Sequence, residues 1–257
     1  MTNSNKKWWH HIEPWIIPFV ILVSWEVTNK LGILANSVLP APSDVLKAGI
    51  VQVQNGNLIA HLQISTTRAL TGFIIGGTLA FIIGVINGVV PIAQRYLDTT
   101  IQMFRNIPNL ALIPLIIIWF GVGEEGKIFL VAISVFFPIY VNTYHGIRNV
   151  DPRLIEMAKI YNLSKTKLFF KVIILGALPS ILVGVRYSLG VMWLTLIVAE
   201  TVAASSGIGY MSMNAREYMQ LDIVVLAILL YALLGKFADS IAKLLEKKLL
   251  KWHAAYQ

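Results

Sequence analysis

The sequence predicts an all-α integral membrane protein with about six transmembrane helices. Of its 257 residues, 56% are hydrophobic and only 13% are charged, and the mean hydropathy is +0.70. This composition is typical of a chain that is solvated by lipid rather than by water. The apolar residues gather in runs of membrane length, separated by short polar and basic segments, so helices that cross a bilayer are expected.

The formal net charge of +8 does not indicate a nucleic-acid partner. The basic residues lie beside the apolar runs, as the positive-inside rule describes, so the expected partner is the lipid bilayer. The chain has no cysteine, which excludes a disulfide framework and thiolate chemistry. No Ser/His/Asp or Cys/His arrangement is visible, and the His10–His11 pair has no further metal-ligand pattern beside it. We therefore expect no catalytic residue, no metal and no cofactor on this chain.

The first span is expected from about Pro14 to Thr28. Lys6 and Lys7 precede it, but no small-residue cleavage site follows in the usual position, so an uncleaved span is expected rather than a signal peptide. Glu26 and Lys30 cut it short, which makes it the weakest of the expected spans. Three tryptophans are expected at the membrane interface: Trp8, Trp9 and Trp15.

The stretch from Asn36 to Thr67 is polar, and its prolines predict a loop. Within it, Ser43 to Val53 predicts a short amphipathic helix on the membrane surface. The second span, Ala69 to Gln94, carries no charge and is long enough to cross a hydrocarbon core of ~30 Å. Small residues recur along it at every fourth position: Gly72, Gly76, Ala80, Gly84 and Gly88. Such a stripe lets another helix approach closely, either in the chain's own bundle or along a pore or dimer seam.

The third span, about Thr99 to Phe120, contains Arg105, Pro108 and Pro114. Each proline removes a backbone hydrogen bond, and the freed carbonyl needs another partner in lipid. Broken helices at membrane depth are tolerated where they face protein or a water-filled cavity, as in transport pathways. Pro108 and Pro114 are therefore candidates for the translocation pathway, with an ordinary kinked packing helix as the alternative.

The segment GVGEEGK, Gly121 to Lys127, nearly matches the phosphate-binding Walker A pattern. Ile128 stands where a hydroxyl would hold Mg²⁺, and two glutamates would repel phosphates. The flanking sequence is also membrane helix rather than the strand that the motif needs. If the protein uses ATP, a separate subunit must therefore bind it.

The remaining spans are expected at Ile128 to Tyr144, Val172 to about Val198 and about Ile223 to Gly235. Arg186 lies near the middle of the fifth span and Glu200 near its far end, too far apart along one helix to pair with each other. Ionisable residues in a membrane are functional candidates, so both are further pathway candidates. Arg186 either attracts an anionic substrate or has a structural partner.

The polar stretch from Asp151 to Pro179 follows the fourth span and predicts a short amphipathic helix, a sharp turn and a second helix that runs into the membrane. Asp151 is a suitable N-cap and Pro152 a suitable first helical residue. Asn162 tolerates the left-handed conformation that ends helices, and Ser164 can cap the second helix. One face of the first helix is formed by Leu154, Met157, Ala158 and Tyr161. A helix this short needs packing to persist in water, which favours docking on a partner.

The basic residues predict the orientation in the membrane. The densest cluster between spans comprises Arg148, Arg153, Lys159, Lys165, Lys167 and Lys171. The positive-inside rule places this loop in the cytoplasm, and with six spans both termini then lie on the same side. Further clusters near both ends agree: Lys6 and Lys7, and Lys243, Lys247, Lys248 and Lys251.

The stretch from Asp151 to Pro179 resembles the EAA loop of ABC importer permeases. Glu156, Met157 and Ala158 hold the first three places of the motif, Asn162 stands where Gly is usual, and Leu175 stands where Pro is usual. The resemblance extends over IQMFRNIPNLALIPLIIIWFG, KIFLVAISVFFPIYVNTYHGIRNVD and MWLTLIVAETVAASSGIGYMSMNARE. Together these segments resemble the permease subunits of aliphatic sulfonate ABC importers.

The resemblance implies an ABC type-1 importer permease fold in a bacterial cell (inner) membrane, as a multi-pass protein. It implies a homodimer, a pair of ATPase subunits that hold ATP and Mg²⁺, and an extracytoplasmic substrate-binding protein. The chain itself would not be an enzyme; it would import alkanesulfonates for sulfur supply. The expected ATPase-coupling residues are Leu154, Glu156, Met157, Ala158, Tyr161 and Asn162.

The expected domains are an N-terminal helix with an outer loop (1–60), a transmembrane domain (61–245) with a cytoplasmic coupling loop (148–171), and a cytoplasmic tail (246–257). Permeases for taurine, nitrate and thiamine precursors share this layout, so a related small anion or nutrient is an alternative substrate. An ion-coupled secondary transporter is an alternative of another class; it needs acidic relay residues within the spans. Only Glu26 and Glu200 come near that requirement, and both lie near span ends.

Overall fold

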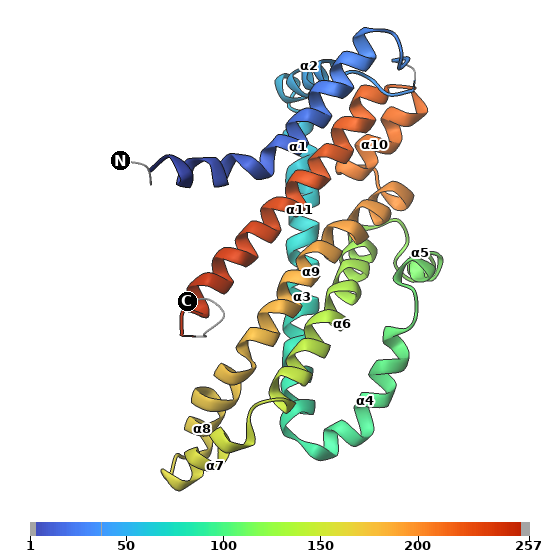
Figure 1. The fold of residues 1–257 in the computed structure, drawn as a ribbon. Helices are drawn as coiled ribbons and strands as arrows, with labels where there is room; N and C mark the ends of the chain where they lie inside the picture. Colours follow the sequence, from blue (N-terminus) through green and yellow to red (C-terminus); the bar gives the residue numbers. More distant parts are fainter. Residues whose placement is uncertain (1–3, 37, 253–257) are drawn as a thin grey trace. The chain divides into compact units, whose positions relative to one another are not determined.

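The computed structural model describes residues 4–36 and 38–252, and this part of the chain is helical without a strand (Figure 1). It divides into two units. The smaller contains Met1–His61 and Met211–Leu230, and the larger contains Leu62–Tyr210 and Tyr231–Gln257.

The smaller unit contains α1 (Ser4–Lys30) and α2 (Pro42–Gln54). The Glu26 carboxylate, at the end of α1, accepts a hydrogen bond from the Ser43 N–H at 3.0 Å and pairs with Lys30 at 2.8 Å. Asn29 donates to the Leu39 carbonyl at 2.7 Å. These contacts fix the turn that leads from α1 to α2. The helix expected over Ser43 to Val53 is confirmed. Pro42 lies in its first turn, where the missing backbone N–H costs no hydrogen bond.

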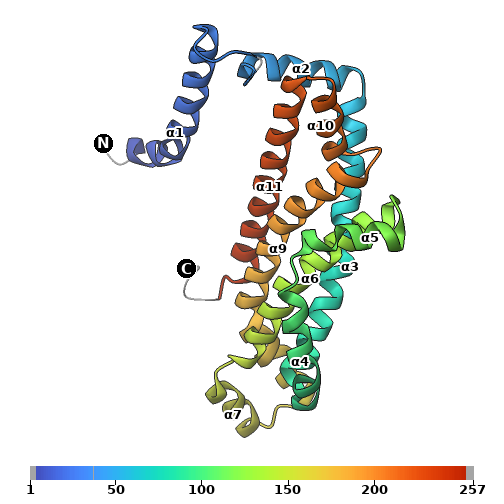
Figure 2. The same ribbon diagram turned by 90° about the vertical axis from the view of Figure 1, so that its right-hand side faces the viewer.

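The larger unit is built on α6 (Glu124–Arg148) and α9 (Ile174–Ala203), which pack side by side (Figures 1 and 2). Helices α3 (Asn57–Val89) and α11 (Leu221–Leu249) add to the same core. The core residues are apolar and fully or almost fully buried: Ala69, Ala80, Val131, Val135, Ile139, Tyr140, Tyr144, Met192, Trp193, Leu196 and Ala238. Helix α3 begins before Ala69, where the second span was expected to start, and α11 continues past Gly235, where the last span was expected to end.

The stripe of small residues on α3 packs against α6. A Cβ added to Gly72 would lie 2.7 Å from Val131 Cγ1, and one added to Gly88 would lie 2.8 Å from Ile147 Cγ2. At Gly76 it would overlap the carbonyl oxygen of Ala132. The sequence left several roles open for this stripe. In the structure it allows close packing within the chain's own bundle.

The third span is broken, as the prolines predict. Helix α4 (Pro91–Arg105) is followed by the 3₁₀ helix η1 (Asn109–Leu112) and by α5 (Ile113–Phe120), and the two parts are bent by 86°. Figure 2 shows the change of direction between α4 and α5. Pro108 immediately precedes η1, and Pro114 lies in the first turn of α5, where a missing N–H costs no hydrogen bond.

By length and composition, four helices of the described chain can cross a membrane: Asn57–Val89, Glu124–Arg148, Lys165–Val202 and Leu221–Leu249. The bent pair of α4 with η1 and α5 makes a fifth if it counts as one span. The expected first span, Pro14 to Thr28, is helical within α1, but α1 is not among the helices that are long and apolar enough to cross a membrane. Glu13, Glu26 and Lys30 lie close to both ends of its apolar stretch and shorten it.

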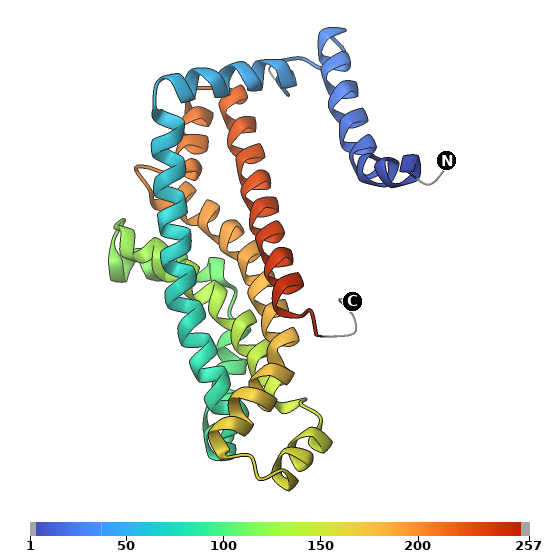
Figure 3. The same ribbon diagram turned by 90° about the vertical axis from the view of Figure 1, so that its left-hand side faces the viewer.

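The segment between the fifth and last spans contains a helix, α10 (Ile208–Glu217). Gly207, at φ +109°, turns the chain into it, because glycine adopts this conformation without strain. At the other end of α9 lie α7 (Pro152–Ile160), α8 (Lys165–Leu168) and the π-helical turn η2 (Phe169–Ile173). Figure 3 shows these short yellow helices at the end of the bundle where α9 begins.

Candidate functional site

The loop between α6 and α9 contains the predicted short helix and turn, and the second helix, capped by Ser164, continues into the span Lys165–Val202. The Asp151 carboxylate accepts a hydrogen bond from the Arg153 N–H at 2.9 Å, and the Ser164 hydroxyl accepts one from the Lys167 N–H at 3.4 Å. Asn162 ends α7 in the left-handed region, at φ +52°. Asn therefore serves in the place where the EAA motif has Gly, because it tolerates this conformation.

The apolar face of α7 is divided between the chain and its surface. Ala158 is buried, at 3% exposure, and Ile155 packs against the cluster of Ile147, Val150, Ala177 and Ile181. Three expected coupling residues are exposed: Leu154 at 44%, Met157 at 49% and Tyr161 at 74%. Ile155 thus attaches α7 to the bundle, Ala158 is covered by the chain itself, and the apolar surface that a partner can reach is formed by the other three.

Beside α7, Leu154 and Met157 line a cavity of about 330 Å³. The rest of its wall comes from the first turns after α8 and from the end of the described chain: Lys171, Val172, Leu175, Gly176 and Trp252. Glu156 and Asn162 are exposed near it on the same short helix and its C-terminal turn. The loop therefore presents an apolar hollow with basic and acidic groups around it.

A second apolar cavity lies beside the third span, and residues next to both prolines line it. Helices α4, η1, α5 and α6 enclose about 500 Å³. Its lining residues include Phe104, Ile107, Leu112, Trp119 and Phe137. Asn109, the residue after Pro108, donates from its side-chain amide to the Ser134 hydroxyl at 3.0 Å. The chain after the break is thereby attached to α6, while Pro108 and Pro114 themselves are exposed.

Arg186 is held by acidic residues of α11. Its Nε donates to Asp239 Oδ1 at 2.7 Å, and its Nη1 lies 3.5 Å from Glu246 Oε2. Asp239 also pairs with Lys243 at 2.9 Å. Arg186 therefore has the structural partner that was one of its two expected roles, and it joins α9 to α11.

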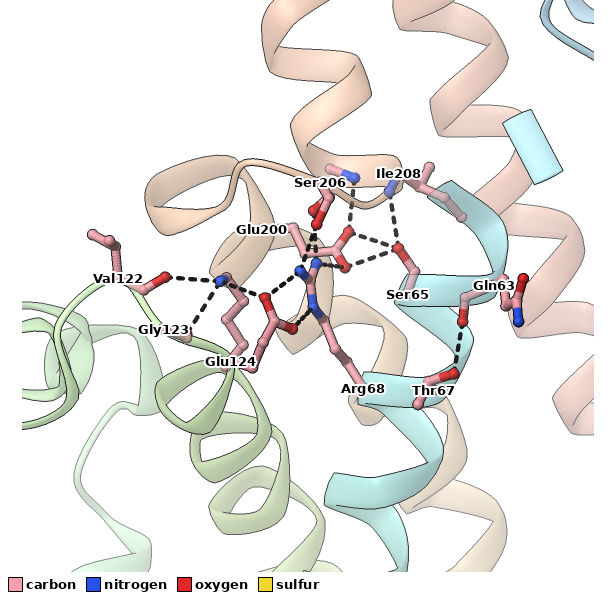
Figure 4. A network of polar contacts seen from close by, with 12 residues as sticks. Gln63, Ser65, Thr67, Arg68, Val122, Gly123, Glu124, Glu200, Ser206 and Ile208 are labelled. Atoms are coloured by element: carbon pink, nitrogen blue, oxygen red, sulfur yellow. Dashed lines mark hydrogen bonds and ion pairs between the residues drawn. The ribbon is translucent and has the colours of Figure 1, made fainter. Parts of the chain in front are cut away.

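Glu200 lies in a buried polar network that the sequence did not predict (Figure 4). Arg68 of α3 is its ionic partner, with Nη1 2.8 Å from Glu200 Oε1. The exposed fractions are 2% for the Arg68 side chain and 0% for that of Glu200. A buried charge is costly unless it is paired and hydrogen-bonded, so each residue depends on the other.

Every N–H of the Arg68 guanidinium has an acceptor. Nε and Nη2 form a two-pronged contact with the carboxylate of Glu124, in which the Nη2–Oε1 distance is 2.6 Å. Nη2 also donates to Ser206 Oγ at 2.9 Å, and Nη1 donates to the Ser206 carbonyl at 2.6 Å. Arg68 thus connects α3, the start of α6 and the turn after α9, and it offers no free donor to an anion.

Glu200 accepts hydrogen bonds from several segments. The Ser65 hydroxyl lies 2.8 Å from each carboxylate oxygen. The Gly209 N–H and the Tyr231 hydroxyl donate to Oε2 at 2.9 and 3.1 Å. A Cβ at Gly207 would overlap this carboxylate, so the turn can fold over Glu200 because it has no side chain there. Glu200 is therefore enclosed by protein rather than open to a pathway.

The segment that resembles a Walker A motif completes the network. The Lys127 ammonium donates to the Val122 and Gly123 carbonyls at 3.0 and 3.1 Å, and it lies 3.3 Å from Glu124 Oε1. The Lys127 side chain is 4% exposed, and these partners all lie in the preceding turn, at residues 122–124. Glu124 and Lys127 are thus structural ion-pair partners, which agrees with the rejection of a phosphate site.

Among the described residues, no group of three or more His, Cys, Asp or Glu side chains could hold a metal ion. The paired charges of Arg68 and Lys127 with Glu124 and Glu200 also cancel. The network therefore has the chemistry of a fixed support. Sequence reasoning missed Arg68 and Ser65, although one signal existed: Arg68 directly precedes the long uncharged run of the second span.

Comparison with known proteins gives the family. A family model described as a binding-protein-dependent transport system inner membrane component matches residues 58–251. The chain is 55% identical over 256 residues to the candidate aliphatic sulfonates transport permease protein SsuC of Escherichia coli (strain K12), covering 100% of this chain and 97% of that one. It is 44% identical over 242 residues to the protein of the same description from Bacillus subtilis (strain 168), covering 94% and 88%.

A solved structure, described as an amino acid ABC transporter with histidines, has the same fold with a TM-score of 0.64 and 16% identity, covering 78% of this chain and 97% of that one. Both the sequence match and the fold agree with the EAA-loop resemblance. The chain therefore belongs to the binding-protein-dependent inner membrane components, as a multi-pass transport permease with the fold of ABC importer permeases.

Proposed function

We propose that this chain is the membrane-spanning subunit of an ATP-driven importer of aliphatic sulfonates. The single observation that carries this proposal is the 55% identity, over the whole chain, to a relative described as a permease for these compounds. A sulfonate is a permanent anion in water, and an apolar bilayer excludes it. Its import needs a protein path and, against a gradient, a source of free energy.

The chain works as one of two identical permease subunits, and ATP with Mg²⁺ binds to a pair of separate ATPase subunits. The coupling surface consists of Leu154, Glu156, Met157, Tyr161 and Asn162. Support comes from the exposure of the three apolar residues in this set on a helix that is too short to be stable alone. An exposed apolar helix face of this kind fits a groove on a partner protein. Ala158 is buried by the chain itself rather than exposed on this surface, and it helps to hold α7 on the bundle.

The orientation proposed has the coupling loop and both termini in the cytoplasm, with α1 as the sixth span. The domain division proposed is 1–60, 61–245 with the coupling loop 148–171, and 246–257. Basic residues at the loop and at both ends support this orientation. Glu200 and the turn after α9 then lie on the outer side, because α9 runs from the coupling loop to Glu200.

In the proposed cycle, a binding protein carries the sulfonate to the outer segments, and ATP closes the ATPase pair against the coupling loop. Movement of α7 then reaches the bundle through Ala158 and Ile155. The path opens to one side of the membrane at a time by rocking of the spans, the usual mode of transporters with broken helices. The bent third span, with Pro108 and Pro114, is the proposed wall of this path.

The test is uptake of labelled ethanesulfonate and hexanesulfonate by cells with and without this chain, with taurine as a competing compound. We expect saturable uptake that needs this chain and stops when ATP is depleted. Uptake that persists without ATP but follows an ion gradient would favour a secondary transporter. Uptake of taurine in preference to both alkanesulfonates would contradict the proposed substrate and leave the permease assignment intact.

A further inference from the structure

The partners of Glu200 lie where the chain passes from one unit to the other. These passages follow His61, Tyr210 and Leu230. Ser65 comes shortly after the first passage, Gly209 precedes Tyr210 at the second, and Tyr231 is the first residue after the third. All three donate to the same buried carboxylate from within the larger unit. Each place where the chain passes between the two units therefore lies near a residue that is hydrogen-bonded to Glu200.

The Glu200 carboxylate also belongs to α9. This helix continues without a break from Ile174, next to the coupling loop, to Ala203. The coupling loop itself is attached to the first turns of α9, since Ile173, Ala177 and Ile181 share a cluster with Ile155 of α7. One helix thus carries the coupling loop at one end and the anchor of all three passages at the other.

The network has the composition of a support that holds position. Arg68 compensates the charge of Glu200 and is itself saturated, with its remaining donors on Glu124 and Ser206. The Ile208 N–H donates to the Ser65 hydroxyl at 2.9 Å, so the turn after α9 is also bonded to α3. These bonds join the Glu200 carboxylate of α9 to α3, to the start of α10 and to Tyr231 of α11, so we expect a displacement of one segment to be transmitted to α9.

We propose that Glu200 is a positioning residue for transport: it relays docking of the binding protein on the outer segments to α9 and so to the coupling loop. This inference rests on the proposed function, because it needs a binding protein outside and an ATPase inside. It goes beyond that function by assigning the relay to one carboxylate. It also replaces the expectation that Glu200 lines the pathway, since its side chain is 0% exposed.

The experiment compares ATP hydrolysis by the complete complex in liposomes, with and without its binding protein loaded with ethanesulfonate. The measured quantity is the ratio of stimulated to basal hydrolysis at saturating binding protein. A substitution that only lowers the amount of folded complex reduces both rates and leaves the ratio unchanged. We expect Glu200→Gln to bring the ratio close to one, with an unchanged half-saturating concentration of binding protein.

Tyr231→Phe and Ser65→Ala each remove one donor to Glu200 without leaving a buried charge. They decide the question if Glu200→Gln does not assemble, and we expect each to lower the ratio by less. The matched control is Glu246→Gln, which alters a nearly buried glutamate of the same unit that pairs with Arg186. Its ratio should equal that of the wild-type complex.

A wild-type ratio in Glu200→Gln, or in both Tyr231→Phe and Ser65→Ala, would overturn the relay. An equal fall in Glu246→Gln would do so too, because the effect would then be a general loss of rigidity. Failure of the proposed function has a different signature: the wild-type complex itself would not respond to ethanesulfonate. The same variants would then be compared with taurine on the binding protein.

Discussion

Arg68 and Glu200 lie 132 residues apart in the chain, and their side chains meet at 2.8 Å in a site that is closed to solvent. Arg68 is the ionic partner of the buried Glu200 carboxylate, so removal of Arg68 leaves an uncompensated buried ion, whereas Arg68 is also paired with Glu124. The pair joins the second span to the fifth, and the turn between the fifth and last spans folds around it. This relationship gives the first prediction.

Arg68→Met should destabilise the protein by about 3–5 kcal/mol, the usual cost of breaking a buried ion pair. The measurement is the midpoint of heat-induced loss of monodisperse protein in detergent. Arg95→Met is the control, because Arg95 is an exposed arginine on α4. The double variant Arg68→Met with Glu200→Met should lose less than the sum of the single losses, since no buried charge remains unpaired. Equal midpoints for Arg68→Met and the control would contradict the pair's importance.

Gly76→Ala should reduce the folded yield and the thermal midpoint, because a Cβ there overlaps the Ala132 carbonyl. Forced overpacking costs roughly 1–3 kcal/mol, and α3 cannot move away without disturbing Gly72 and Gly84 as well. Gly235→Ala is the matched control, since a Cβ at Gly235 meets no atom within 4 Å. If both variants behave like the wild type, the close packing of α3 on α6 would be refuted.

Glu156→Lys should leave insertion and thermal stability unchanged but abolish substrate-stimulated ATP hydrolysis by the complex. Glu156 is exposed on the short helix that we propose as the coupling element, and exposed ion pairs within the chain contribute only ~0.2–1 kcal/mol. Glu217→Lys makes the same change of charge on an exposed residue at the end of α10. Because Glu217 lies on the proposed outer side, it controls for insertion and stability alone, and full stimulation in Glu156→Lys would show that α7 is not the coupling element.

Single cysteines can test the proposed orientation, since the chain has none of its own. Ser164→Cys should react with a membrane-impermeant maleimide only after the cells are permeabilised. Ser205→Cys, exposed on the turn at the other end of α9, should react in intact cells. Labelling of Ser164→Cys from outside would reverse the proposed orientation of the coupling loop.

Arg186→Gln should lower the thermal midpoint while uptake per folded molecule stays close to the wild-type value. The reason is that Arg186 binds Asp239 at 2.7 Å and Glu246 at 3.5 Å, and these contacts occupy the side chain. Sulfonate uptake is normalised to the amount of protein in the membrane. Reduced uptake at normal abundance and stability would instead assign Arg186 to the substrate path.

Much of the local structure was predictable from the sequence, because its causes are local. The caps at Asp151 and Ser164, the left-handed Asn162 and the break at Pro108 depend on single residues and their neighbours. The membrane character follows from apolar runs of the required length. These features are determined by backbone sterics and by transfer from water to lipid, which do not depend on the rest of the fold.

The partners of residues far apart in the chain were decided only by the tertiary structure. The sequence left the roles of Arg186 and of the small-residue stripe open, placed Ala158 on an accessible face and gave Glu200 no partner. Each of these depends on which helices become neighbours, and spacing along one helix carries no information on that. Arg68 meets Glu200 because α3 and α9 approach within one bundle, and burial of both charges there makes the contact obligatory.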